Sequence, residues 1–240
     1  MIAPPAAARA RRRHAPALAL SIVLSLVLAH AACATSTPIA PEPAMSTPTP
    51  AFLASRERLM NLIAKTDAAE LAWSASSAQK SLAGDPDARA AALDIAHDAE
   101  LGATTRMKAY EAYVGLGGSI DPAESASAAQ IYAAALTAEK NGHDAWGYPG
   151  LSPSGAGRRV VGFGPAAVDA LLPLLDSTIL LVYEGSEEPT VAEMRRYRVK
   201  DLAATWLAVL LGASFDGEVD DPAQRDPAIA ELARQARARH

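Results

Sequence analysis

The sequence predicts an all-α fold: an irregular array of antiparallel helical hairpins with about seven helices. Alanine, the strongest helix former, accounts for 56 of the 240 residues, and only 5% are aromatic. From Ala51 onward, apolar residues recur three or four positions apart, the period of a helix with one buried face. Helix-start signals recur as Asp-Pro pairs, because Asp accepts free amide hydrogens and Pro at the first helical position loses no bond. These pairs begin at Asp85, Asp121, Asp221 and Asp226.

The first part of the helical region contains several further helix signals. Residues 52–63 predict a first helix, because its apolar residues fall on one face. Asp67 and Glu70 have the spacing of a capping box, which predicts a second helix running toward Leu82. The Asp-Pro pairs at positions 85 and 121 precede long Ala-rich stretches, and each predicts the start of another helix.

The C-terminal third repeats these signals. Helix starts are predicted at residues 164–165, 190–193 and 226–227, from a Gly-Pro pair, a Thr-x-x-Glu capping box and an Asp-Pro pair. Pro173 predicts a kink in the first of these helices, because proline removes a backbone donor and its ring clashes with the preceding turn. Gly212 predicts the end of the second helix, since glycine readily takes the left-handed conformation there.

Residues 1–33 have the pattern of an export signal. Four arginines and no acidic residue precede an apolar run at 16–29, which is shorter than the roughly 20 residues that a membrane span needs. Cys33 follows two alanines and resembles the lipidated cysteine of a bacterial lipobox, although His30 stands where that pattern has Leu. The alternative is cleavage after Ala31, at an Ala-x-Ala site. We therefore expect a protein of the bacterial cell envelope, lipid-anchored through Cys33 or periplasmic, with secretion as the alternative.

The rest of the chain divides into a tether and a folded domain. Residues 34–50 are rich in Pro, Thr and Ser, which predicts an extended, disordered tether ahead of a helical domain at 51–240. Beyond residue 33 the chain has 18 basic and 27 acidic residues, a formal charge of −9. Such a domain repels nucleic acid and anionic lipid headgroups, so we expect a protein partner and no nucleic acid. A single cysteine excludes a disulfide framework.

Three segments of this domain resemble parts of HEAT-type repeats. Residues 106–112 and 198–204 share the pattern Arg-apolar-Lys-x-apolar-x-Ala. Residues 85–93, Asp-Pro-Asp-x-Arg followed by an Ala-rich stretch, resemble the second helix of such a repeat. Residues 163–175 resemble the first helix, including its proline kink. Residues 183–203 resemble a stretch of uncharacterised bacterial HEAT-like exported proteins and lipoproteins, so the resemblance covers mainly the C-terminal part.

The resemblance implies a fragment of an α-solenoid with a binding or scaffolding surface and no catalytic residues. The copies are unevenly spaced, which favours an irregular array over a regular superhelix. Arg89, Arg106 and Arg198 lie near predicted helix starts. We expect these arginines to pair with acidic residues of neighbouring helices.

Two segments imitate ligand-binding motifs. Residues 162–167 match the dinucleotide fingerprint G-x-G-x-x-A, but that motif needs a strand of about five residues in a parallel sheet. We instead interpret these residues as the turn that leads into a helix. Residues 216–221 form an acidic stretch like a calcium loop, although the positions for Gly and Glu hold Asp221 and Pro227. We expect a solvated acidic turn.

The histidines inside the predicted helical domain do not have the spacing of a metal site. His97 and His143 lie far apart, without the short spacing that zinc sites favour, so neither a metal nor a cofactor is predicted. The sequence contains no G-x-S-x-G or H-E-x-x-H motif either. We therefore expect a protein that is not an enzyme. The alternative is an envelope hydrolase or cofactor-binding enzyme with a site between the 141–160 segment and His97 or His143.

Residues 141–160 are predicted to form a long loop within the helical domain. Long ordered loops often carry function, and aromatic and arginine side chains anchor partners. The alternative is that the aromatic residues fold back onto Ala-rich helices that lack bulk of their own. We expect a non-catalytic binding or scaffold protein of the envelope that presents a helical surface. Its candidate partner-binding residues are His143, Trp146, Tyr148, Arg158 and Arg159.

Overall fold

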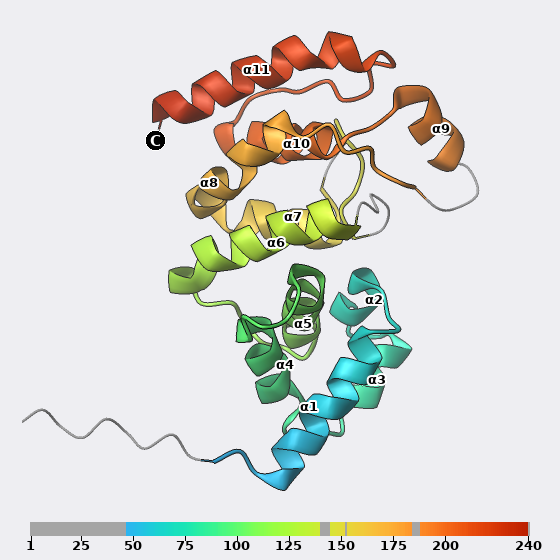
Figure 1. Cartoon of the computed structure of the whole chain (residues 1–240), viewed down its shortest axis with the longest axis vertical. Coiled ribbons are helices and arrows are strands. Elements are labelled where there is room, and N and C mark those ends of the chain that lie inside the picture. The colour runs from blue at the N-terminus through green and yellow to red at the C-terminus, as the bar shows by residue number, and fades with distance from the viewer. Residues whose placement is uncertain (1–46, 140–144, 152, 184–187, 240) are drawn as a thin grey trace, which may run out of the picture. The chain divides into compact units, whose positions relative to one another are not determined.

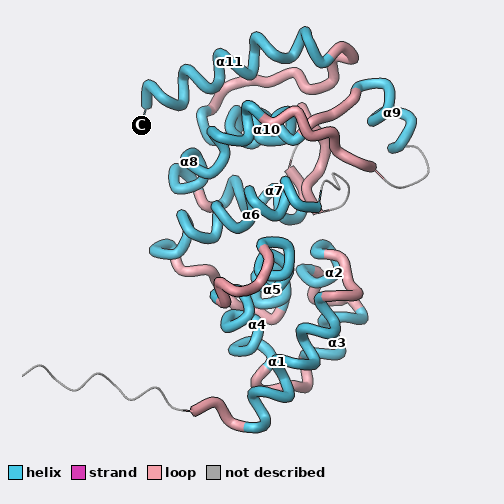
Figure 2. The backbone as a smooth tube through the Cα atoms, viewed as in Figure 1, coloured by secondary structure: helices cyan, strands magenta, loops and turns pink. Residues whose placement is uncertain are grey.

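The computed structural model describes residues 47–139, 145–151, 153–183 and 188–239, all within one compact unit, Ser46–His240. These residues form eleven α-helices and three short 3-10 helices, without a strand, which confirms the all-α prediction (Figure 1, Figure 2). In the same ranges no helix is both long and apolar enough to cross a membrane. The predicted signal with Cys33, and the tether up to residue 46, lie outside the described residues.

The first six helices pack around α4 and α5. Helix α5 packs against α4, α6 and α2, and α4 also packs against α1. Their facing sides consist largely of alanine, which lets the helix backbones approach closely. The bounds are α1 (Pro50–Ile63), α2 (Ala68–Ala72), α3 (Ser77–Leu82), α4 (Ala88–His97), α5 (Ala103–Gly115), η1 (Pro122–Glu124) and α6 (Ser125–Glu139).

The C-terminal elements surround one buried helix. Helix α10 packs against α11 on one side and against α7, α8 and η3 on others (Figure 1). Leu180 and Arg198 form an isolated antiparallel bridge just before this helix. The bounds are α7 (Gly155–Gly162), η2 (Gly164–Ala167), α8 (Val168–Leu171), η3 (Leu172–Asp176), α9 (Glu188–Arg195), α10 (Val199–Leu211) and α11 (Pro222–Arg239).

The eleven α-helices exceed the seven or so expected, because several predicted helices are divided. The helix expected from Asp67 to Leu82 ends at Ala72, and a new one begins after Ser76, whose hydroxyl accepts the Gln79 amide at 3.0 Å. The helix expected to kink at Pro173 is a series of 3-10, α and 3-10 turns over residues 164–176. Shorter helical segments thus replace longer continuous helices in both regions.

Two predicted helix starts are corrected. Thr190 lies inside α9, whereas α10 begins after Arg198, whose backbone amide donates to Asp201 at 2.8 Å. The last helix begins at Pro222 and carries Pro227 in its interior. The carboxylate of Asp221 accepts the Ala223 amide at 2.9 Å, so the earlier of the two Asp-Pro pairs starts this helix.

Other signals are confirmed. Asp121 precedes η1 and accepts the Ala123 amide at 2.8 Å, as expected of a cap. Gly212 ends α10 with a φ of 64°, a left-handed conformation that glycine adopts without steric cost. One face of α11 is buried, and it consists of Ile229, Leu232, Ala233 and Ala236.

Aromatic side chains fill the space that alanine leaves in the core. The ring centroids of Trp146 and Trp206 lie 5.7 Å apart, and Tyr132 contacts both Trp146 and Phe163 edge-on, at 6.3 and 5.5 Å. Gly157 permits this packing, because a Cβ atom there would lie 2.5 Å from the backbone oxygen of Trp146. Helix α7 therefore approaches the tryptophan segment more closely than a residue with a side chain would allow.

Candidate functional site

A groove with a cavity volume of about 770 Å³ lies between α5 and α7. Its charged lining residues are Glu111 from α5 and the neighbouring pair Arg158 and Arg159 from α7. Ser119 and Ser125 add hydroxyl groups. The other lining residues are apolar or small, and they are Ala72, Val114, Gly118, Ile120, Pro122, Gly155, Gly162, Phe163, Pro165 and Ala166. We refer to this cavity as the α5–α7 groove.

A buried carboxylate forms one wall of the α5–α7 groove. The Glu111 side chain is only 1% exposed, and both of its oxygens accept hydrogen bonds from Arg159, Oε1 from Nε at 3.2 Å and Oε2 from Nη2 at 3.0 Å. The hydroxyl of Tyr132 from α6 also donates to Oε1. Three donors therefore neutralise a carboxylate that would otherwise be costly to bury. The pair also fixes the plane of the Arg159 guanidinium.

Tyr132 and Arg159 keep fixed protonation states at ordinary pH. Burial raises the pKa of Tyr132 well above its ordinary value, and the nearby charge of Glu111 raises it further. Burial lowers the pKa of Arg159, but its hydrogen bonds and charge interaction with Glu111 outweigh this and raise the pKa overall. Tyr132 thus stays a neutral donor and Arg159 a cation at ordinary pH. Groups that do not change protonation near neutral pH are poor general acids or bases.

Arg158 is the one charge of the lining without a counterion nearby. Its side chain is exposed, and in the described parts of the chain it makes no hydrogen bond or ion pair. Because Glu111 is satisfied by Arg159, the charged lining residues sum to +1. The groove is therefore a positive site on an acidic chain, which attracts anions.

The predicted loop is shorter than expected, and its tryptophan is a core residue. Trp146 is completely buried between Tyr132 and Trp206, so it presents no surface to a partner. This corrects its assignment as a partner anchor and agrees with the alternative, in which loop aromatics fold back onto Ala-rich helices. Tyr148 is half-buried and stacks on Tyr183 with centroids 4.9 Å apart.

Of the three other partner-binding candidates, the two arginines line the α5–α7 groove and the histidine lies outside the described residues. Arg158 and Arg159 lie in helix α7, which begins at Gly155, and not in a loop that continues to residue 160. Both line the α5–α7 groove. His143 lies outside the described residues.

His97 does not contribute to the groove. Its Nε2 atom lies 3.2 Å from Glu124, and its ring meets Tyr110 edge-on at 6.0 Å. Across the described ranges, no group of three or more His, Cys, Asp or Glu residues could hold a metal ion.

The two motif lookalikes have local structural roles. Gly162 ends α7, so in the structure a helix and not a strand precedes the glycine-rich turn at 162–167. In the acidic turn, Asp216 accepts the Glu218 amide at 3.0 Å, and Asp220 pairs with Arg195 at 3.3 Å. The helix entry and the acidic turn are thus the interpretations that these contacts support.

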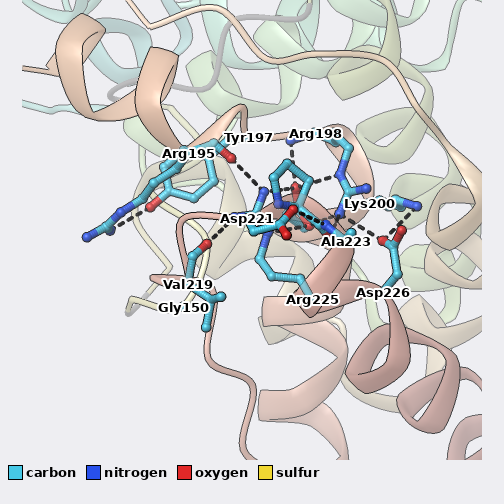
Figure 3. Close-up of polar contacts among 12 residues, drawn as sticks. Gly150, Arg195, Tyr197, Arg198, Lys200, Val219, Asp221, Ala223, Arg225 and Asp226 are labelled. Carbon is cyan, nitrogen blue, oxygen red and sulfur yellow. Dashed lines mark hydrogen bonds and ion pairs between the residues drawn. The ribbon is translucent and has the colours of Figure 1, made fainter.

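A second charged cluster holds the C-terminal helices together (Figure 3). Asp201 is fully buried and accepts hydrogen bonds from Arg198 and from Arg225, whose side chain is also fully buried. Arg225 donates in addition to the backbone oxygens of Val219 and Arg195. Both arginines direct their hydrogen bonds at protein atoms, so we assign this cluster a structural role. We call these three side chains the Asp201 cluster.

The expected arginine pairings are confirmed at one position of three. Arg198 pairs with Asp226 of α11 at 2.9 Å, as well as with Asp201 of its own helix. Arg106 donates instead to the backbone oxygen of Ala96 at 2.9 Å, which satisfies a carbonyl at the end of α4. Arg89 is exposed and has no polar partner among the described residues.

Sequence reasoning missed Glu111, which organises the groove. Its signal is its position four residues after Met107, so that a carboxylate stands on the buried face of α5.

Comparison with protein-family models, with curated proteins and with solved structures finds no match to this chain. The residues that line the α5–α7 groove are therefore the basis for the function proposed below.

Proposed function

We propose that this chain is an exported, non-catalytic binding protein of the bacterial cell envelope, whose α5–α7 groove receives a protein partner. The observation that carries the proposal is the exposed Arg158 beside an apolar wall and a fixed Arg159. Arginine is enriched in protein interfaces, because its planar guanidinium makes several directed hydrogen bonds at once. A binding role fits this groove better than catalysis, since its one carboxylate, Glu111, is already neutralised.

The proposal includes a HEAT-like arrangement of the helices that carry the groove. Consecutive helices α4, α5 and α6 pack against one another, as successive hairpins of a solenoid do. Neighbouring helices of this kind support a rigid concave surface without a sheet. The breaks at residues 73–76 and 172–176 make the array irregular.

The proposed location depends on Cys33. A lipid on this cysteine, followed by the tether at 34–50, would hold the acidic domain near a membrane while keeping it away from anionic headgroups. Mass spectrometry of the mature N-terminus tests this part. We expect a lipid-modified Cys33 as the first residue. An unmodified N-terminus at Ala32 would contradict the anchor and favour a periplasmic or secreted protein.

Site-specific photo-crosslinking in intact cells tests the binding role. A photoreactive amino acid replaces Ser119, which is exposed at the groove, and in a matched control it replaces Ala90, which is exposed on α4 and does not line the groove. We expect a discrete protein adduct at position 119 and none at position 90. Arg158→Glu should abolish the adduct, whereas Arg89→Glu should not. Equal adducts at both positions, or none at position 119, would contradict the proposal.

A further inference from the structure

We infer that the α5–α7 groove recognises the free C-terminal carboxylate of a polypeptide whose last residues are apolar. The inference rests on the proposed function of the groove as a binding site, and it names the chemistry of the ligand. The charge of the lining, the geometry of the two arginines and the apolar wall each support it.

The charge balance favours a monoanion. Glu111 is bound by Arg159 and Tyr132, so Arg158 supplies the positive charge that remains in the lining. One carboxylate neutralises that charge. A phosphate dianion would leave an excess negative charge in a chain that is already acidic. A neutral ligand would leave Arg158 without a counterion.

The geometry of the arginines suits a carboxylate. Arg159 binds Glu111 through Nε and Nη2, and Nη1 takes no part in that pair. Its side chain remains 27% exposed, and both it and Arg158 line the groove from the same helix. Because Glu111 fixes one guanidinium in place, little entropy is lost when a ligand carboxylate binds to it. The exposed guanidinium of Arg158 completes the anion site.

The rest of the lining favours an apolar group attached to that carboxylate. Val114, Ile120 and Phe163 lie on the walls together with Pro122 and Pro165. A cavity of about 770 Å³ falls within the range of sites that enclose a ligand of several residues' or a drug molecule's size, roughly 300–1,000 Å³. A terminal carboxylate with apolar neighbours would fill both parts of the groove, whereas a small free acid would leave much of it empty.

Titration of the purified full-length chain with defined probes tests this inference. The probes are the tripeptide N-acetyl-Ala-Ala-Leu with a free carboxylate, the same peptide with a C-terminal amide, and hexanoate. We expect the carboxylate peptide to bind at least about tenfold more tightly than the amide, because a charge-assisted hydrogen bond is lost in the amide. We also expect it to bind more tightly than hexanoate, and inorganic phosphate should not displace it.

Two variants assign the binding to the arginines. Arg158→Glu changes an exposed side chain, so the protein should fold, and the carboxylate peptide should bind at least about tenfold more weakly. Arg159→Lys keeps the charge opposite Glu111 but removes the planar fork, and it should weaken binding with circular dichroism unchanged. Arg89→Glu, an exposed arginine outside the groove, is the matched control and should bind as the unchanged protein does.

The outcomes separate this inference from the proposed function. Equal binding of the acid and amide peptides, no binding of either, or equally tight binding of hexanoate would overturn the C-terminal assignment. If a crosslinked partner at position 119 still depends on Arg158 in that case, the binding role stands and only the ligand chemistry is wrong. Tight, Arg158-dependent binding of the carboxylate peptide without any crosslinked partner would instead leave the groove assignment intact and remove its role in cells.

Discussion

The two parts of the helical unit are held together by different means. Between residues 50 and 139, twelve of the 22 buried hydrophobic residues are alanine, whereas between 145 and 239 alanine accounts for eight of 22. Each part buries two tyrosines, but the second part also buries two tryptophans and the Asp201 cluster. The first part therefore gains stability from close approach of regular helices, and the second from large side chains and directed polar contacts.

Short elements give the buried arginine of the second part a further role. The elements from Gly155 to Arg195 are eight residues long or shorter, so many of their backbone groups lie near an end and have no partner within the helix. Arg225 donates to the backbone oxygen of Arg195, at the end of one such helix, and to that of Val219 in the following connection. A buried side chain thus supplies donors that the local backbone does not.

The largest effect that we expect comes from Arg225→Met. The variant leaves the buried Asp201 with a single arginine partner and removes the donors to two carbonyls. We expect the free energy of unfolding to fall by about 3–5 kcal/mol, the usual effect of breaking a buried ion pair. Urea unfolding followed by circular dichroism measures it.

The matched control for Arg225 lies on the same helix. Arg234 pairs with Glu231 but is 70% exposed, and Arg234→Met should change the free energy of unfolding far less than Arg225→Met does. Similar losses for the two variants would mean that the Asp201 cluster adds no more than a surface pair. The second part would then be stabilised by its aromatic packing alone.

The alanine-rich part should respond to added volume. Ala91 is completely buried on α4, which packs against both α1 and α5, so the side chain of Ala91→Leu would force these helices apart. We expect a loss of about 1–3 kcal/mol in the free energy of unfolding. Ala90→Leu places the same side chain on the exposed face of that helix and should be nearly neutral. An equal effect at both positions would contradict close alanine packing, and thermal unfolding of the two variants decides it.

The periodic and local features of the fold could be predicted from sequence. The helical period identified the all-α class, and Gly212 and Asp121 ended or capped helices where expected, because each signal acts within one turn of chain. The break near Trp73 was not predicted, because a single capping bond from Ser76 distinguishes a new helix from a continuous one there. A kink was predicted at Pro173, but the change between 3-10 and α turns over residues 164–176 was not.

The candidate site could be predicted only in part. Arg158 and Arg159 were identified as binding candidates by residue type, and both line the α5–α7 groove. Their relation to Glu111 joins residues 48 positions apart, which no local pattern specifies. Trp146 was a partner-binding candidate because of its aromatic character, with burial against Ala-rich helices as the alternative. The structure agrees with the alternative, because small alanine side chains leave space in the core that a large side chain fills.

The smallest effect that we expect concerns the pH dependence of an ion contact in the alanine-rich part. The hydroxyl of Ser55 on α1 lies 2.6 Å from Oδ1 of Asp85, and Arg58 pairs with Oδ2. The hydrogen bond from Ser55 is the main cause that lowers the pKa of Asp85 below its ordinary value of 3.8, and Arg58 adds to it. A lowered pKa means that the folded state favours the charged carboxylate. Its contribution is therefore complete above the ordinary pKa and is lost as the pH falls through the folded value.

Ser55→Ala tests this dependence and shows how a partly exposed contact differs from the Asp201 cluster. We expect a loss of about 1 kcal/mol in the free energy of unfolding at pH 7, since one hydrogen bond to a carboxylate is removed. The difference between the variant and the unchanged protein should shrink in urea titrations below the ordinary pKa, because protonation of Asp85 removes the same interaction. Ser81→Ala removes a hydroxyl that donates to the backbone oxygen of Ala78, and its effect should not vary with pH. A pH-independent effect of Ser55→Ala would show that this serine stabilises α1 by filling space, in the manner of the alanines around it, and not through the charge of Asp85.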